Sequence, residues 1–345
     1  MLHRFLLLVL ACAVLASGEA AKPLLSFGPW LPLAPGGKPL DISYFNLLPD
    51  TDGGVELWFD ANFRGTDSVI GLAGKDLASL VPTLPRFDAS IVQGYDADLL
   101  GRKTPIISRA QACRLPDGRM AVVAAIGPEY GAGGKLTELW PALFVSPDGT
   151  PGSWKHLGPP PGEPVEELKT ARNGKGAFRF EGGSLHVRPD GTYVIYCGWN
   201  PGPQGARLAM LTAKSLEGPW AFKRAGRKIV DLSAKLSGGW LFPAVHDLGP
   251  RGLLLCGGDT WPPKRIDAAI SLDGETFTQL PAPLVLPGQV VAESTSIKSL
   301  RLLYLPATDR VVAVGNPHVK GSPGGLMYPL YWAEGTFAKP LPARK

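Results

Sequence analysis

Three acidic side chains stand at the starts of apolar, strand-like segments. Asp41 opens DISYFNLLP, Glu181 opens EGGSLHVRP and Glu293 opens ESTSIKSLRLLYLP. A carboxylate beside a buried strand costs free energy unless it is paired or used for chemistry. Two carboxylates that face one pocket can cleave a glycosidic bond, one as the proton donor and the other as base or nucleophile. Asp41, Glu181 and Glu293 are therefore the candidate catalytic residues, although each could instead accept backbone N–H bonds or pair with an arginine.

Polar and aromatic side chains accompany these acids at two kinds of position. Some stand at or next to the starts of strand-like segments, and the others follow the second strand of a hairpin, in GWNPGPQG, GGDTWPP and GNPHVKG. Aromatic faces with amide and carboxylate neighbours suit a sugar, because the ring face stacks and the hydroxyls hydrogen-bond. The tryptophans could equally anchor loops by packing. The candidate substrate-binding residues are Arg109, Gln111, Arg179, Trp199, Asn200, Asp259, Trp261 and His318.

A strand, a polar turn and a more apolar strand recur five times along the chain. The copies begin at Asp41, Ser108, Glu181, Phe242 and Glu293, and their turns use Pro, Asp and Gly, as tight hairpins require. Each copy is followed by a further apolar strand that runs into another turn, and helical periodicity is almost absent. Five such units predict an all-β fold, a five-bladed β-propeller with four antiparallel strands per blade.

The N-terminal segment, residues 1–20, has the pattern of a secretory signal peptide. It has one early arginine, an apolar stretch and then small residues, and no later stretch is long and apolar enough to span a bilayer. We therefore expect an exported protein, secreted or periplasmic, without a membrane partner after cleavage. Residues 21–345 should form a single, monomeric propeller domain, closed by pairing of the N-terminal LLSFGPWLPL with the last blade.

Charge and cysteine spacing restrict the partners and cofactors. The net charge of +5 includes no basic stripe, so no nucleic acid is expected. After the signal segment an odd number of cysteines remains, Cys113, Cys197 and Cys256, which favours buried, reduced thiols, with a Cys197–Cys256 bridge as the alternative. No CxxC or HxxxH spacing exists, so no metal and no cofactor are expected, although a structural cation in the channel of the propeller stays open. His246 is expected to be structural.

Local motifs resemble those of known propellers. The turns SPDGT and SLDGETF resemble the Asp-box turns of sialidase-type propellers, and most of the chain resembles the five-bladed glycoside hydrolases of the arabinanase, β-xylosidase and levansucrase kind. On DISYF and EGGSLHVRPDGTYVIY, that resemblance implies Asp41 as base and Glu181 as general acid. It also implies an acid-orienting aspartate in the second blade, where SRAQACRLPDG has Arg109 or Gln111. Arg109 would lower the pKa of a neighbouring acid, which is the wrong direction for a proton donor.

These patterns predict an exported carbohydrate-active protein, a glycoside hydrolase with a carboxylate pair in its central funnel, acting on an oligosaccharide or polysaccharide. The missing second-blade aspartate leaves three readings open: Glu293 has taken over a role, the substrate is unusual, or catalysis has been lost. The alternatives are a non-catalytic glycan-binding propeller and a sialidase-like hydrolase. The five-fold repeat and the lack of a clear arginine triad with a Tyr/Glu nucleophile disfavour the sialidase.

Overall fold

The computed structural model describes residues 24–42, 44–50, 52–60, 68–83, 87–88, 106–127, 140–157, 179–200, 207–226, 228–237, 240–259, 262–319 and 328–337. Regular structure in these ranges is almost entirely β-strand, with one short helix, α3 (Pro287–Val290), and 3-10 turns such as η1 (Pro35–Gly37) and η4 (Gly249–Arg251). Within the same ranges, no helix is long and apolar enough to cross a membrane.

The described strands form five antiparallel sheets of four or five strands, which are the blades of a propeller. Blade one contains β4 (Phe45–Pro49), β5 (Val55–Asp60), β6 (Ser68–Gly74), β7 (Val81–Pro82) and β8 (Phe87–Asp88). Blade two contains β9 (Ile106–Arg114), β10 (Met120–Gly127), β11 (Trp140–Ser146) and β12 (Lys155–His156). Blade three contains β13 (Arg179–Val187), β14 (Tyr193–Asn200), β15 (Arg207–Ala213) and β16 (Ala221–Phe222).

The two remaining blades come from the C-terminal half of the chain. Blade four contains β19 (Leu241–Asp247), β20 (Leu253–Gly258), β21 (Ile266–Ser271) and β22 (Thr278–Gln279). Blade five contains β23 (Ile297–Leu305), β24 (Arg310–Pro317), β26 (Tyr331–Phe337), β1 (Leu25–Phe27) and β2 (Leu31–Pro32). Two short pairs lie outside the blades, β17 (Arg224–Ala225) with β18 (Lys228–Ile229), and β3 (Asp41–Ile42) with β25 (Tyr328–Pro329).

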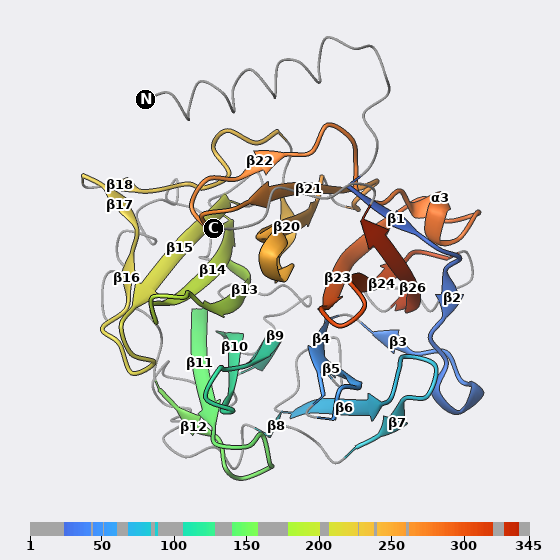
Figure 1. The fold of residues 1–345 in the computed structure, drawn as a ribbon, viewed down its shortest axis with the longest axis horizontal. Coiled ribbons are helices and arrows are strands. Elements are labelled where there is room, and N and C mark those ends of the chain that lie inside the picture. The colour runs from blue at the N-terminus through green and yellow to red at the C-terminus, as the bar shows by residue number, and fades with distance from the viewer. Residues whose placement is uncertain are drawn as a thin grey trace, which may run out of the picture.

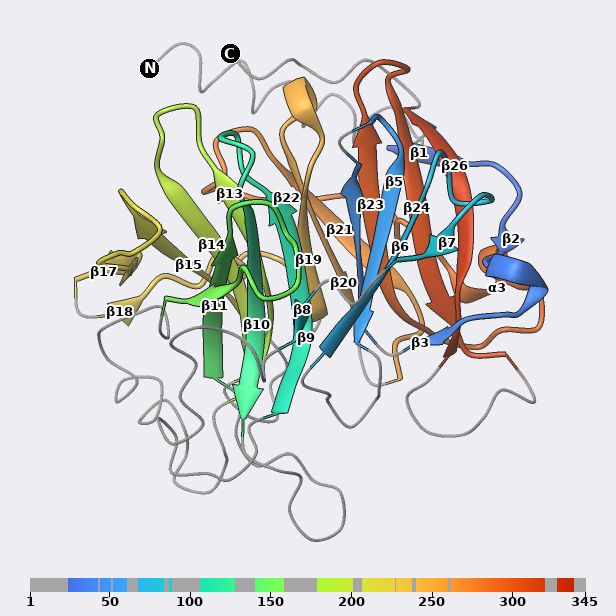
Figure 2. The ribbon, with the colours of Figure 1, turned by 90° about the horizontal axis from the view of Figure 1, so that it is seen from below.

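The sheets stand around one axis, with the first strand of each blade nearest to it. The inner strands contact one another in a closed order, β4 with β9, β9 with β13, β13 with β19, β19 with β23 and β23 with β4. Figure 1 shows this arrangement along the axis, and Figure 2 shows from the side that the strands run between the two faces of the disc. All five inner strands therefore bring their starts to one face and their ends to the other.

The N-terminal strand completes the last blade, as the sequence predicts. In β1, Leu25 pairs with Phe337 and Phe27 with Gly335 of β26, so the outermost strand of blade five comes from the opposite end of the chain. Joining the two ends in one sheet covers the free edge of β26 and closes the ring.

Packing between neighbouring blades explains why many strands are apolar on both faces. Every residue of β20, LLLCGG, is buried, because each sheet is covered by a blade on either side. The core between blades two and three shows this, with Phe144, Phe180 and Ile195 fully buried in one cluster. Apolar burial of this kind is the main stabilising contribution to the fold.

The predicted Asp-box-like turns have a common hydrogen-bond pattern. Ser146 Oγ accepts from Gly149 N at 2.7 Å and Asp148 Oδ1 from Thr150 N at 2.9 Å. In blade four the equivalent serine, Ser271, accepts from Gly274 N at 2.9 Å. Two short polar side chains thus satisfy the backbone of a turn that leaves the third strand of a blade.

The three cysteines in the described part of the chain, Cys113, Cys197 and Cys256, are unpaired, as expected, and the alternative Cys197–Cys256 bridge is not formed. Cys197 and Cys256 are buried, Cys113 is half-buried, and burial raises the pKa of each thiol to about 12. Because the thiolate is the reactive species, buried thiols react slowly.

For the protein without residues 1–20, which contain Cys12, we therefore expect Cys197 and Cys256 to resist a thiol reagent in the native state and all three remaining thiols to react after denaturation without reductant. Spectrophotometric thiol titration measures both numbers. Cys256→Ala should remove one thiol from the denatured count and leave native labelling unchanged. Rapid native labelling of either buried thiol, or a missing thiol after denaturation, would contradict this arrangement.

Candidate functional site

Four inner strands are irregular near their starts. The pairing register shifts opposite Arg109 in β9, at Glu181 in β13, at Phe242 in β19 and at Lys298 in β23. A bulge of this kind re-aims the side chain of the extra residue and is common beside active sites. Blade one contributes Tyr44, which directly precedes β4. The same position in all five blades is therefore set apart from the regular ladder.

Side chains from four of these positions meet at the axis, and we call Tyr44, Arg109, Phe242 and Lys298 the strand-head cluster. The Tyr44 and Phe242 rings are 5.8 Å apart at an interplanar angle of 62°. Lys298 Nζ lies 4.0 Å from the Tyr44 centroid and Arg109 Cζ lies 4.9 Å from it. Cation–π contacts of this kind are most favourable when desolvated, and Lys298 is only 1% exposed and Arg109 6%.

Two residues of the cluster have a backbone conformation that L-amino acids seldom adopt. Arg109 has φ 55° and Phe242 has φ 49°, both in the left-handed region. Such a residue costs about 1–3 kcal/mol and persists where the surroundings enforce it, most often at functional sites. This strain, at equivalent places in two blades, supports the strand heads as the functional face.

A few residues further along each inner strand lies a buried polar side chain that contacts a neighbouring blade. We call these five side chains the axial belt. Its members are Asn46, Gln111, Ser184, His246 and Arg301. With its amide nitrogen toward blade three, Gln111 donates to Ser184 Oγ at 2.9 Å and accepts from Arg301 Nη2 at 3.1 Å. The backbone N–H of Val245, in blade four, also donates to Ser184 Oγ, at 3.1 Å.

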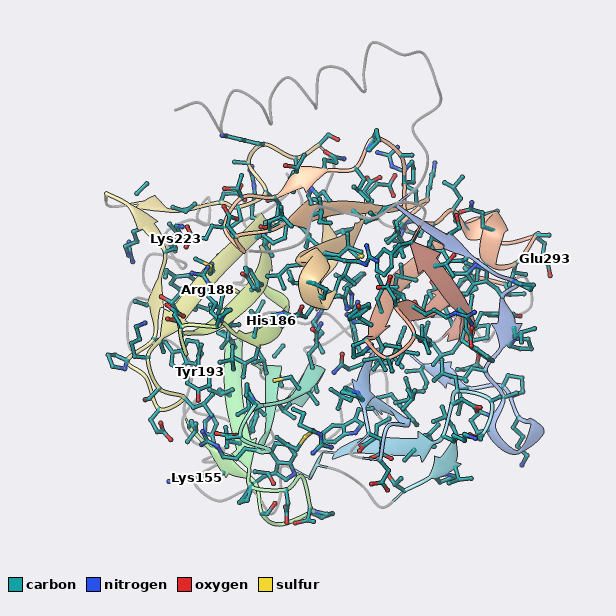
Figure 3. All side chains as sticks on the ribbon, viewed as in Figure 1. Lys155, His186, Arg188, Tyr193, Lys223 and Glu293 are labelled. Atoms are coloured by element: carbon teal, nitrogen blue, oxygen red, sulfur yellow. The ribbon has the colours of Figure 1, made fainter. Side chains whose placement is uncertain are left out.

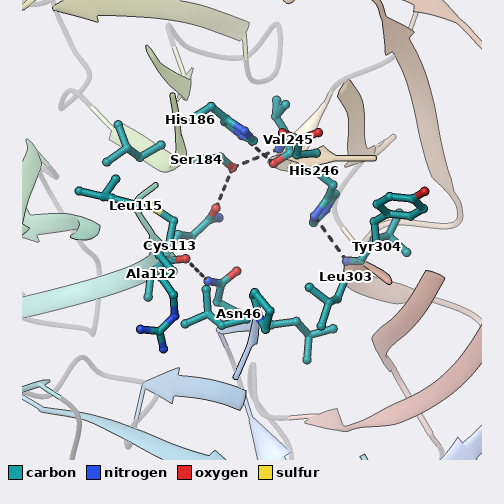
Figure 4. Close-up of a pocket in the computed structure, with 18 of the residues that line it drawn as sticks. Asn46, Ala112, Cys113, Leu115, Ser184, His186, Val245, His246, Leu303 and Tyr304 are labelled. Atoms are coloured by element: carbon teal, nitrogen blue, oxygen red, sulfur yellow. Dashed lines mark hydrogen bonds between the residues drawn. The ribbon is translucent and has the colours of Figure 1, made fainter. Parts of the chain in front are cut away.

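The remaining blade-to-blade bonds complete this belt. Asn46 Nδ2 donates to Ala112 O at 2.5 Å, between blades one and two. Between blades four and five, Leu302 N donates to His246 Nδ1 at 3.4 Å. Figure 4 draws both bonds together with those of Ser184. The belt therefore ties the inner strands together directly beside the strand-head cluster and holds their register.

Burial dominates the electrostatics of the belt. It lowers the pKa of His246 to about 3, with smaller contributions from the positive charges of Arg301 and His186. It also lowers the pKa of Arg301 to about 10, so this guanidinium is still a cation at neutral pH. His246 is a neutral, hydrogen-bonded structural residue, as predicted. Among the described residues, Lys298, Arg109 and Arg301 bring three cationic side chains near the axis.

A cavity of about 350 Å³ lies at the other end of the axis (Figure 4). It is lined by Asn46, Gln111, Ser184 and His246 of the belt and continues toward the ends of the inner strands, as far as Tyr304. No residue of the strand-head cluster lines it. The belt therefore separates this cavity from the strand heads. Among the described residues, no group of three or more His, Cys, Asp and Glu side chains could hold a metal ion.

The three candidate carboxylates lie in different surroundings. Asp41 is half-buried in β3, just before blade one. The backbone of Glu181 lies at the bulge of β13, but its side chain is outside the described part. Glu293 is exposed in the turn after α3, at the outer edge of the molecule in Figure 3. Both Asp41 and Glu293 precede the inner strand of their blade, since β4 begins at Phe45 and β23 at Ile297, but Asp41 is half-buried in a strand whereas Glu293 is exposed in a turn.

The candidate binding residues are also divided. Arg109 belongs to the strand-head cluster, whereas Gln111 is buried and its amide is used within the belt, so the expectation that Gln111 faces the substrate is not supported. Asp259 accepts from Lys264 N at 2.9 Å and thus orders its own loop. His318 is exposed and packs edge-on against Tyr328, at 5.2 Å. The side chains of Arg179, Trp199, Asn200 and Trp261 lie outside the described part.

Sequence reasoning missed the most informative members of the site. Lys298 and Arg301 stand in IKSLRLLYL, a strand whose other residues are mainly apolar. Two cations inside an apolar strand indicate a functional position as strongly as a carboxylate at its start does, because burying a charge costs free energy unless the charge is paired or used. Tyr44 carried no comparable signal, whereas Phe242 was expected at the start of the fourth repeat.

Comparisons with known proteins place the fold. No family model and no curated protein sequence matches the chain. Among solved structures, it is similar to a putative exo-β-1,3-galactanase from Bifidobacterium bifidum, with 10% identity over 91% of this chain and 94% of that one, at a TM-score of 0.58. An endo-arabinase from Bacteroides thetaiotaomicron matches with 14% identity over 92% and 99%, at 0.57.

A third match extends the likeness to another hydrolase family. The GH32 β-fructofuranosidase BmSUC1 of Bombyx mori matches with 10% identity over 92% of this chain and 62% of its own, at a TM-score of 0.55. At such identities the likeness is one of fold. The chain therefore has, over most of its length, the five-bladed propeller fold found in glycoside hydrolases of families 43 and 32.

Proposed function

We propose that this protein hydrolyses glycosidic bonds at the face of the propeller where the inner strands begin. The observation that carries the proposal is the position of Glu181, at the bulge of β13 in blade three. The equivalent bulges of three other blades contain Arg109, Phe242 and Lys298 of the strand-head cluster. Asp41 lies in β3, just before the inner strand β4 of blade one, and the resemblance implies a base there. The hydrolase names of the structural neighbours add support.

In the proposed reaction, Glu181 gives a proton to the glycosidic oxygen as the bond to the leaving group breaks. Asp41 either takes a proton from the attacking water, which inverts the anomeric centre, or attacks that centre itself to form a covalent glycosyl-enzyme. In the second case water then displaces Asp41, Glu181 takes the proton of that water, and the two displacements together retain the configuration. The carboxyl separation decides between these courses, roughly 6.5–9.5 Å for inversion and about 5 Å for retention. Glu293, exposed on the outer turn, has no part in this scheme.

A glycan-binding propeller without hydrolysis is the second candidate, and one observation favours it. Arg109 stands in blade two, where the resembling enzymes have an aspartate, and Lys298 joins it from blade five. Positive neighbours favour the ionised form of a carboxylate, whereas a general acid must hold its proton. A strictly binding protein needs no protonated acid. Export through residues 1–20 and a secreted or periplasmic location are likewise proposals, since that segment is outside the described residues.

A hydrolysis screen separates the two candidates. We expect the protein to release reducing sugar from at least one member of a panel of aryl glycosides and of plant and bacterial polysaccharides. Asp41→Asn, which keeps the shape and removes the base, should lower that rate by about 10²–10⁴-fold. Glycan affinity without any hydrolysis would favour the binding protein. An unchanged rate in Asp41→Asn would remove Asp41 from the mechanism.

A further inference from the structure

The cavity toward the ends of the inner strands has no part in the proposed reaction. Its volume of about 350 Å³ lies at the lower end of the range of ligand pockets, roughly 300–1,000 Å³. Every blade contributes to its wall, with Asn46, Gln111, Ser184, His246 and Leu302 from blades one to five. A pocket of this size on the axis of the fold can hold a small molecule, and the side chains of its wall indicate which kind.

Asn46 presents a hydrogen-bond acceptor to the cavity. This residue is only 9% exposed, and its Nδ2 donates to Ala112 O at 2.5 Å, which fixes the orientation of the amide. The carbonyl end therefore points away from Ala112, and Figure 4 shows Asn46 at the wall of the cavity. Asn46 Oδ1 accepts no hydrogen bond from a described residue. A buried acceptor without a donor costs free energy, so a donor on a bound molecule would be stabilising.

Ser184 presents a donor to the same cavity, from blade three. Its Oγ accepts from the Gln111 amide at 2.9 Å and from Val245 N at 3.1 Å, which occupies both acceptor positions of the hydroxyl. The hydroxyl proton of Ser184 has no acceptor among the described residues. Ser184 is 8% exposed and lines the cavity. The wall thus has an unused acceptor in blade one and an unused donor in blade three.

The arginine and the aspartate that line the cavity each have a partner within the protein. Arg114 Nη2 lies 3.6 Å from Glu56 Oε1, and Asp247 Oδ1 accepts from Gly249 N at 2.8 Å. A bound anion could accept from the serine hydroxyl, but it would repel the amide oxygen. A metal ion could take the amide oxygen as a ligand, but it could not accept the serine proton. A neutral hydroxyl both donates and accepts, so it can satisfy both groups.

We propose that this cavity binds a neutral, polyhydroxylated molecule of about the size of one sugar ring. Its hydroxyls donate to Asn46 Oδ1 and accept from Ser184 Oγ, and its C–H groups pack on apolar residues of the wall such as Leu302 and Leu303. A monosaccharide and an open-chain polyol share this chemistry. Because the axial belt separates the cavity from the strand heads, this second site does not depend on hydrolysis at the strand heads.

Calorimetric titration of the full-length protein tests this proposal with three sets of probes: neutral hexoses and pentoses, the open-chain polyols derived from them, and the uronic acids of the same hexoses. We expect at least one neutral probe to bind with a Kd of about 1 mM or tighter, and its uronic acid to bind severalfold more weakly. Whichever neutral set binds more tightly separates a monosaccharide ligand from a polyol. No binding of any neutral probe at about 50 mM, or tighter binding of the uronic acids, overturns the proposal.

Four variants locate the bound molecule. Asn46→Leu and Ser184→Ala each remove one of the two unused groups and should weaken binding about tenfold. Asp247→Asn is the matched control on the same wall: it removes a charge, can still accept from Gly249 N and should leave the affinity unchanged. Glu181→Gln, at the strand heads, should also leave it unchanged. An equal loss in Asp247→Asn and Ser184→Ala would contradict a neutral ligand. If Asn46→Leu does not fold, Ser184→Ala still decides.

The outcomes for this second site and for the proposed function are distinct. Binding of a neutral probe that Ser184→Ala weakens, without hydrolysis of any glycan, keeps the cavity site and overturns the hydrolase. Hydrolysis without such binding keeps the hydrolase and overturns the cavity site. Binding that Glu181→Gln weakens and Ser184→Ala does not would place the probe at the strand heads and overturn the cavity site as well.

Discussion

Replacing Glu181 by Gln is expected to lower the hydrolysis rate by about 10²–10⁴-fold on glycosides with poor leaving groups. The substitution keeps the size of the side chain and removes the transferable proton. The loss should be much smaller on aryl glycosides with good leaving groups, since these depart with little protonation. Initial rates on a leaving-group series, together with the affinity for a non-hydrolysed oligosaccharide, measure both effects.

Two variants control for unrelated consequences of this change. Glu334→Gln removes an exposed carboxylate of β26 that pairs with Arg310, and its rate should equal that of the parent. Glu293→Gln tests the residue that the sequence placed at a strand head, and a large rate loss there would return Glu293 to the site. If Glu181→Gln loses the same factor on good and poor leaving groups, with folding unchanged, Glu181 is a binding residue and not the acid.

Replacing His246 by Asn is expected to flatten the loss of stability on mild acidification. His246 has a pKa of about 3 in the folded protein and about 6.5 when unfolded, so between these values the unfolded chain binds a proton that the folded one does not. Stability therefore falls as the pH drops below 6.5, by up to about 1.4 kcal/mol per pH unit from this residue. Above 6.5 it contributes no pH dependence.

Chemical denaturation at several pH values between 4 and 7 measures this slope. The Asn oxygen can still accept the Leu302 N–H that His246 Nδ1 accepts, but it does not titrate. Ser184→Ala, which removes a belt hydroxyl and no titrating group, should lower stability and keep the slope of the parent. Equal slopes in His246→Asn and the parent would show that His246 is protonated in the folded state.

The fold could be predicted from the sequence because the propeller repeats its local signals. Each blade has its own tight turns and apolar strands. In the turns at Asp148 and at Asp273, a glycine N–H donates a hydrogen bond to the Oγ of a serine in the same turn. Closure was also predictable, since the apolar segment containing β1 needs a partner and β26 has a free edge. These inferences use short-range chemistry, which a sequence shows directly.

The site was harder to predict because bulges interrupt the alternation of side chains between the two faces of a strand, and predictions from sequence depend on that alternation. The bulge between Ile297 and Leu300 places Lys298 at the axis, while α3 and its turn occupy the segment before it and leave Glu293 outside. Gln111 is only two residues beyond Arg109, but it faces the belt instead of the strand heads. A single-residue shift in register decides which of the two side chains can meet a ligand.

The central claim, that a saccharide is bound and cleaved at the strand heads, is tested most directly by a crystal structure of Glu181→Gln with a bound substrate oligosaccharide. The claim predicts the sugar at the face where the inner strands begin, over Tyr44, Arg109, Phe242 and Lys298, with residue 181 within hydrogen-bond distance of a glycosidic oxygen. A saccharide found instead in the cavity at the opposite end of the axis, or on the outer edges of the blades, would contradict it.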